Sequence, residues 1–260
     1  MLRIVAWLIV ASLAGALAVA LAGPYVTASF GLSRGRQAIE QKRYGEAAIA
    51  FEEVLRDRPG ELRAHQGLAE AYKGQYVPGG ETPRNLELAQ RAREELETVI
   101  RGESRNAAAV ASLAAVHFEQ QRYDEAVRWY ERLAELTPAA VEPHARLGEI
   151  AWRRFWTADL EARIATGMPV EMAGPIADAR ARAALREAWE PVIDRGVTHL
   201  AQALALDGQN ASVLMTMSRV ARARADLAGT PGDYAAQIRT ADGWLDKARA
   251  AERAARRTRK

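Results

Sequence analysis

The sequence predicts an all-α fold, a solenoid of about five helical hairpins behind an apolar N-terminal segment. Beyond residue 33, Ala, Leu, Glu and Arg dominate, and there are almost no alternating β-branched stretches. The segment 43–55 recurs as 122–134, and both copies begin Arg-Tyr-x-Glu-Ala. A proline follows each copy, at Pro59 and Pro138, where it ends a helix. A recurring helical segment with a fixed stop is typical of a repeat protein.

Composition excludes several classes of function. The 260 residues are 49% hydrophobic, which is enough for a sizeable core and too apolar for a disordered chain. Lys and Arg total 36 against 33 Asp and Glu, so the net charge of +3 creates no strong field for a polyanion. We therefore expect no nucleic-acid partner. The absence of Cys excludes disulfides, thiolate metal sites, thiol catalysis and a lipoprotein cysteine.

Residues 1–23 are predicted to be a transmembrane anchor or a signal peptide. The stretch 4–22 is apolar, interrupted only by Ser12 and Gly15. About 20 apolar residues can span a bilayer, whereas a signal-peptide apolar region runs about 7 to 15, so the length favours an anchor. An Ala-Leu-Ala pattern directly before Gly23 fits signal cleavage, so both alternatives stay open.

The flanks of this segment predict where the repeats lie. Arg3 precedes the apolar stretch, and the spacer 24–33 contains no Lys or Arg. The positive-inside rule then places the N-terminus in the cytoplasm. We expect the chain in the bacterial inner membrane, which it contacts through this segment, with the repeats in the periplasm. If the signal is cleaved, the chain is instead secreted to the periplasm.

The recurring segment resembles the second half of the tetratricopeptide repeat (TPR), whose unit of about 34 residues pairs a helix A with a helix B. Small residues lie where the two helices cross, an aromatic residue follows four positions later, and a proline closes the unit. The matching positions are Gly35, Ala47, Phe51 and Pro59 in the first repeat and Leu113, Ala114, Ala126, Tyr130 and Pro138 in the third. The resemblance implies a right-handed superhelical solenoid in which the aromatic residue fills the gap to the next helix.

The other repeats are longer, and together the repeats occupy 34–251. In the second, an insertion at 76–80 delays helix B. In the fourth, helix B arrives about one repeat late, which predicts an extended hairpin at about 152–206. The stretch from Trp152 onward also resembles the C-terminal half of bacterial exported TPR proteins of unassigned function. The basic tail 252–260 is interpreted as the polar cap of the last helix, with an anionic lipid or acidic partner as the alternative.

No motif predicts catalysis, a cofactor or a metal. The sequence contains no phosphate-binding glycine loop, nucleophile elbow, zinc-binding helix or calcium loop, so we expect no enzyme. His65 and His144 occupy equivalent repeat positions, which predicts packing, and His199 has no evident partner. We expect no shared metal site from these imidazoles, because helices one repeat apart would have to converge on the ion.

The TPR resemblance implies a binding surface on the concave face, which helix A lines. It places that face on Arg36, Ile39, Gln66, Glu70, Ala115, Phe118, Glu149, Trp152, Arg219 and Arg222. The expected function is a protein-binding scaffold or assembly factor of the cell envelope, which holds a partner peptide or helix there.

Two alternatives remain open. The extended hairpin could form an apolar cleft, which would make the chain an envelope module for lipid or another apolar small ligand. Trp152, Phe155 and Trp156 are interpreted as core residues or, alternatively, as an exposed anchor for a partner.

Overall fold

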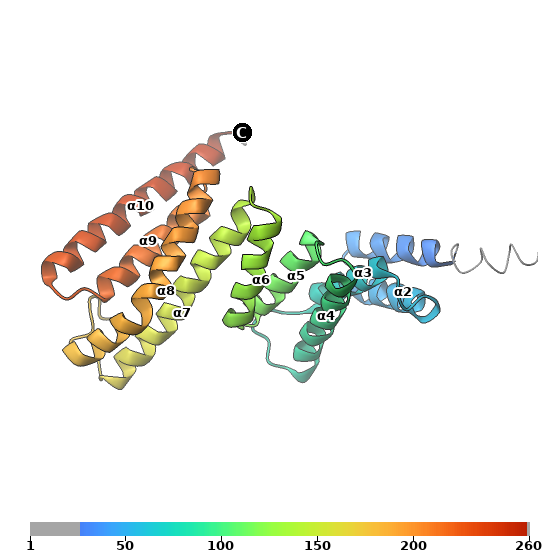
Figure 1. The fold of residues 1–260 in the computed structure, drawn as a ribbon, viewed down its shortest axis with the longest axis horizontal. Coiled ribbons are helices and arrows are strands. Elements are labelled where there is room, and N and C mark those ends of the chain that lie inside the picture. The colour runs from blue at the N-terminus through green and yellow to red at the C-terminus, as the bar shows by residue number, and fades with distance from the viewer. Residues whose placement is uncertain (1–26, 259–260) are drawn as a thin grey trace, which may run out of the picture. The chain divides into compact units, whose positions relative to one another are not determined.

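The computed structural model describes residues 27–258. These residues are helical almost throughout, and none of them forms a strand. Residues 27–40 form the first described helix. It is followed by α2 (Tyr44–Asp57), α3 (Leu62–Gln75), α4 (Pro83–Gly102), α5 (Ala107–Glu119), α6 (Tyr123–Leu136), α7 (Val141–Ala165), α8 (Ala179–Leu206), α9 (Ala211–Asp226) and α10 (Pro231–Thr258) (Figure 1). The all-α prediction is confirmed for this part of the chain, which divides after Gln120 into two compact units.

The same short turn follows α2, α4, α6 and α8, which are the B helices of four repeats. In each turn a backbone N–H donates to the carbonyl three residues earlier, at 2.9–3.2 Å. The donor and acceptor pairs are Glu61 and Arg58, Asn106 and Glu103, Ala140 and Thr137, and Asn210 and Asp207. The repeat is thus present in the backbone even where the sequence motif has drifted.

The first unit is organised around the aromatic ring of Phe51 on α2. The side chain is 1% exposed. A Cβ atom at Gly35, in the helix 27–40, would lie 2.5 Å from Phe51 Cζ, and one at Gly67 on α3 would lie 2.3 Å from the same atom. The ring therefore fills the space between two A helices, as the TPR resemblance implies, and only glycine leaves room for it.

In the second unit, close contact between α7 and α8 holds the long hairpin together. A Cβ at Gly148 would lie 2.3 Å from Leu200 Cγ, and one at Gly196 would lie 2.5 Å from the Cβ of Ala151. Helix α7 also packs against α9, so successive A helices are neighbours. This arrangement brings side chains of α7 and α9 onto one surface.

The ends of the described chain extend the helical array. Residues 27–33, part of the expected spacer, are helical, and Ala28 and Leu32 are buried against the first hairpin. Helix α10 continues to Thr258 and so includes most of the expected basic tail. Within residues 27–258, no helix combines the length and the hydrophobicity that a membrane span requires. The predicted anchor or signal, 1–23, lies outside the described residues.

Candidate functional site

Four of the predicted binding residues line one groove in the first unit. Arg36 and Ile39 come from the helix 27–40, and Gln66 and Glu70 come from α3. The groove has a volume of about 390 Å³. Two further lining side chains, Leu32 and Phe51, are buried, and Ile39 is half-buried, so the groove is partly apolar.

Charged side chains of both signs line the same groove. Arg36, Glu40 and Glu70 are exposed and form no ion pair with another described residue. Arg63 is held by Glu61, with its Nε 2.8 Å from Oε1 of the carboxylate. An apolar floor with free charges above it can bury the side chain of an extended peptide and pair with charges beside it.

The predicted residues of the second unit already interact with neighbouring side chains. The Glu149 carboxylate accepts hydrogen bonds from Arg146 and Arg153 on its own helix, each at 2.9 Å. The Arg219 guanidinium lies 4.8 Å from the ring centroid of Trp152, which links α7 to α9. Arg222 is paired with Asp242 Oδ1 at 2.7 Å. This α7/α9 face is therefore more fully paired than the groove of the first unit.

The remaining predicted residues lie elsewhere or in the core. Ala115 and Phe118 are half-buried on α5 and do not line the groove. Phe155 is 1% exposed, so the hypothesis that it belongs to an exposed aromatic anchor is wrong: it faces the core of the second unit. Trp152 is half-buried against the same core, whereas Trp156 is 52% exposed.

A buried pair of opposite charges on α7 was missed by the sequence analysis. Asp159 and Arg163 are 2% and 5% exposed, and Arg163 Nε donates to Asp159 Oδ2 at 2.6 Å. The other guanidinium nitrogens donate to the carbonyl oxygens of Met172 and Gly174, each at 2.8 Å. Arg163 therefore ties the loop 166–178 to α7. The missed signal is the spacing, because the two residues continue by steps of four the core-facing stripe that Phe155 begins.

Burial changes the protonation of a carboxyl group on α9 that lies beside this charge pair. Burial, and secondly the negative charge of Asp159, raise the pKa of Asp226 to about 7, although Arg163 and Arg222 oppose the change. Arg163 Nη2 lies 3.5 Å from Asp226 Oδ1. Asp226 is thus poised to change its charge near neutral pH.

Two histidines meet between α7 and α8. The Nδ1 atoms of His144 and His199 are 3.3 Å apart and their rings are stacked, so the expectation that His199 has no partner is wrong. Burial lowers the pKa of both imidazoles, and for His199 the neighbouring His144 lowers the pKa further. Within the described chain, no group of three or more His, Asp and Glu side chains could hold a metal ion.

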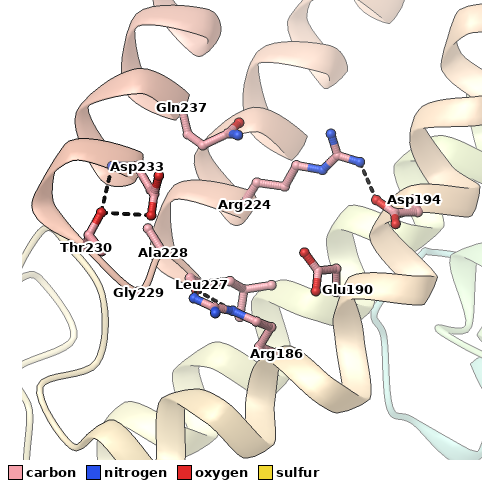
Figure 2. Close-up of a pocket in the computed structure, with 10 residues that line it drawn as sticks. All are labelled: Arg186, Glu190, Asp194, Arg224, Leu227, Ala228, Gly229, Thr230, Asp233 and Gln237. Carbon is pink, nitrogen blue, oxygen red and sulfur yellow. Dashed lines mark hydrogen bonds and ion pairs between the residues drawn. The ribbon is translucent and has the colours of Figure 1, made fainter.

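A pocket of about 650 Å³ lies between α8, α9 and α10, and most of the residues that line it are polar or charged (Figure 2). Arg186 Nε donates to the Leu227 carbonyl at 2.8 Å, which satisfies a carbonyl at the C-terminus of α9. Arg224 pairs with Asp194 across the pocket, and the Thr230 hydroxyl accepts from the Asp233 N–H at 3.1 Å at the start of α10. The polar groups here therefore serve mainly to close helix ends and join helices.

Solved structures of TPR fold resemble the chain. MamA 41-end from Desulfovibrio magneticus RS-1 has a TM-score of 0.60 at 14% identity, and the alignment covers 88% of this chain and 96% of that one. Another MamA structure has a TM-score of 0.58 at 12% identity and 87% and 92% coverage. YrrB, described as a TPR protein with an unusual peptide-binding site, has a TM-score of 0.55 at 12% identity, and the alignment covers 86% of this chain and 90% of that one. No protein-family model and no curated protein matches the sequence. The chain has the TPR fold.

Proposed function

We propose that the chain is a protein-binding scaffold that holds a partner segment in the groove between the helix 27–40 and α3. The observation that carries this proposal is the combination of an apolar floor with exposed charges that have no partner among the described residues. YrrB, which shares the TPR fold, is described as having a peptide-binding site, and this supports the choice of a peptide as ligand.

The groove also favours a mixed ligand over a purely acidic one. Arg36 on one side is balanced by Glu40 and Glu70, so a run of acidic residues would meet repulsion as well as attraction. A peptide segment matches the groove when an apolar side chain packs over Phe51, an acidic residue on one side pairs with Arg36, and a basic residue on the other side pairs with Glu40 or Glu70. We propose a short segment of this chemistry as the partner element.

A peptide-display experiment tests the proposal. Random peptides are selected on the purified full-length chain, and their affinities are measured for the double charge reversal Arg36→Glu with Glu70→Lys. We expect an affinity loss of about tenfold or more, because both ionic contacts become repulsive. The matched control reverses Arg56 and Glu97, which are exposed and lie outside the groove. Equal affinities of the groove variant and the control would refute the groove as the site.

We further propose that the apolar segment 1–23 holds this scaffold at the bacterial inner membrane, with the repeats in the periplasm, or directs its secretion there if it is cleaved. The support is the sequence alone: the length of the apolar stretch and the placement of Arg3 before it. N-terminal sequencing of the protein recovered from membranes distinguishes the two fates, since an anchor retains Met1 and cleavage exposes Gly23.

A further inference from the structure

A second pocket, distinct from the groove, lies in the second unit at the end of α7. It has a volume of about 250 Å³ and is bounded by α7, the loop 166–178, α9 and α10. Asp159 and Asp226 supply carboxylates, Trp156 and Tyr234 supply aromatic rings, and Met172 and Ile238 supply apolar surface. The pocket therefore combines acidic and apolar surfaces at close range.

The acidic part contains an unsatisfied hydrogen-bond acceptor. Asp159 is 2% exposed, and its Oδ1 atom is buried without a hydrogen-bond partner. Arg163 does not supply one: its Nε donates to Oδ2, its Nη1 donates to the Met172 carbonyl and the Met168 sulfur, and its Nη2 donates to the Gly174 carbonyl and lies 3.5 Å from Asp226 Oδ1. A buried carboxylate oxygen without a partner is costly, and because Asp159 lines the pocket, a ligand donor that displaces the atoms covering Oδ1 would offset that cost.

The charges around the pocket leave it short of a cation. Asp159, Asp226 and Glu171 line it together with Arg163 and Arg222. Arg222 is already paired with Asp242 at 2.7 Å, although its charge still acts on Asp226, so once Asp226 ionises at its pKa of about 7 the carboxylates that line the pocket outnumber the cations. A positively charged ligand group restores the balance, whereas an acyl chain would leave Oδ1 unpaired and bury more charge.

The walls select the kind of cation. Aromatic rings attract a cation to their faces, and Met172 and Ile238 can cover an aliphatic stem. A single free carboxylate oxygen suits the compact charge of an ammonium group better than the two-pronged guanidinium of arginine. We propose that this pocket binds the lysine side chain of a partner protein. This site is separate from the groove. It rests on the proposed scaffold function only in that a partner protein supplies the lysine.

Titration with small probes tests this site independently of the groove. The full-length chain is titrated with Nα-acetyl-lysine methylamide, with the indole N–H signal of Trp156 followed by NMR and assigned with Trp156→Phe. The neutral analogue Nα-acetyl-norleucine methylamide and the bare cation n-butylammonium are titrated in parallel. We expect saturable binding of the lysine probe, and affinities lower by about tenfold for the neutral analogue, which lacks the charge.

The variants locate the ammonium group. Asp159→Asn should weaken binding of the lysine probe about tenfold, and Trp156→Ala, which removes a half-exposed wall, provides a second variant if Asp159→Asn does not fold. Glu161→Gln is the control, since it removes the same charge from an exposed position of α7 outside the pocket. Equal binding of lysine and norleucine probes, or an unchanged affinity in both pocket variants, would overturn the proposal. A similar affinity for n-butylammonium is expected, because the pocket contacts only the aliphatic stem and the ammonium group, and a failure of n-butylammonium to bind would overturn the assignment of those contacts.

The pH dependence gives an additional readout. Because the pKa of Asp226 is raised to about 7, its carboxyl group is mostly protonated at about pH 6 and ionised at about pH 8, while the lysine ammonium stays charged. The affinity should therefore rise across this interval and become flat in Asp226→Asn. The charged and titratable groups that line the pocket beside Asp226 are Asp159 and Arg163 of α7, Glu171 of the loop, Arg222 of α9 and Tyr234 of α10. An affinity that is independent of pH in the unmodified chain would contradict an ammonium group placed against Asp226.

Discussion

Replacing Gly67 by Ala should change the free energy of unfolding with a sign that depends on Phe51. A Cβ at Gly67 would lie 2.3 Å from Phe51 Cζ. The ring cannot move away from it, because its other side packs against the backbone of Gly35, where a Cβ would lie only 2.5 Å from the same atom. Overpacking of this kind costs about 1 to 3 kcal/mol, against a gain of about 1 kcal/mol from the higher helix propensity of Ala. We therefore expect Gly67→Ala alone to destabilise the chain by up to about 2 kcal/mol.

In the background of Phe51→Ala the ring is absent, and the same Gly67→Ala change should stabilise by up to about 1 kcal/mol. Phe51→Ala itself should cost about 3 to 5 kcal/mol, since it empties a fully buried site. If that variant is too unstable to measure, Phe51→Leu also removes the ring atoms that the new methyl group would meet.

Urea denaturation of the four proteins of this double-mutant cycle measures the coupling. Gly45→Ala on α2 is the control, because a Cβ there meets nothing within 4 Å, and it should have the same small effect in both backgrounds. An equal effect of Gly67→Ala with and without the ring would refute the close approach of the A helices through Phe51.

Two further predictions concern pH. The folded chain keeps the Asp226 proton up to a pKa of about 7, whereas the ordinary value is 3.8, so the folded state binds more protons between these values and stability should fall as the pH rises through them. Asp226→Asn should remove this loss, which amounts to at most about 4 kcal/mol at pH values above 7. Urea denaturation of both proteins tests this, and a difference between their free energies of unfolding that stays the same across the interval would contradict it. For His144 and His199 the pKa is lowered from 6.5, so the unfolded chain binds more protons below that value and stability should fall as the pH falls. His199→Phe should weaken the drop in melting midpoint between about pH 7 and about pH 5, and an equal drop in both proteins would count against the buried pair.

Much of the fold follows from local sequence signals. The spacing of Ala47, Phe51 and Pro59 predicts a helix with a packed face and a stop, and the structure places α2 at Tyr44–Asp57 with Ala47 and Phe51 buried. The extended hairpin expected at about 152–206 corresponds to α7 and α8, which the loop 166–178 joins. These predictions succeed because helix periodicity and helix termination depend on residues within a few positions of one another.

The groove is predictable for the same reason. Once the repeats are aligned, the residues of helix A that face inward are set by the helical period, and four of them meet in one groove. The burial of Phe155 could not be decided in this way. A Trp and Phe cluster fits a core and an exposed anchor equally well until the helices packed against it are known.

The sequence by itself determined the helical repeat, the small residue Gly35 at the helix crossing of the first repeat and the side chains offered by each A helix. Only the tertiary structure decided which polar groups meet across helices: the unpaired Asp159 oxygen, the raised pKa of Asp226 and the contact of His144 with His199. The physical reason is that these properties depend on burial and on charges from helices far apart in the chain. Which residues of α7, α8 and α9 lie beside one another depends on how these helices pack, and no local sequence pattern encodes that packing.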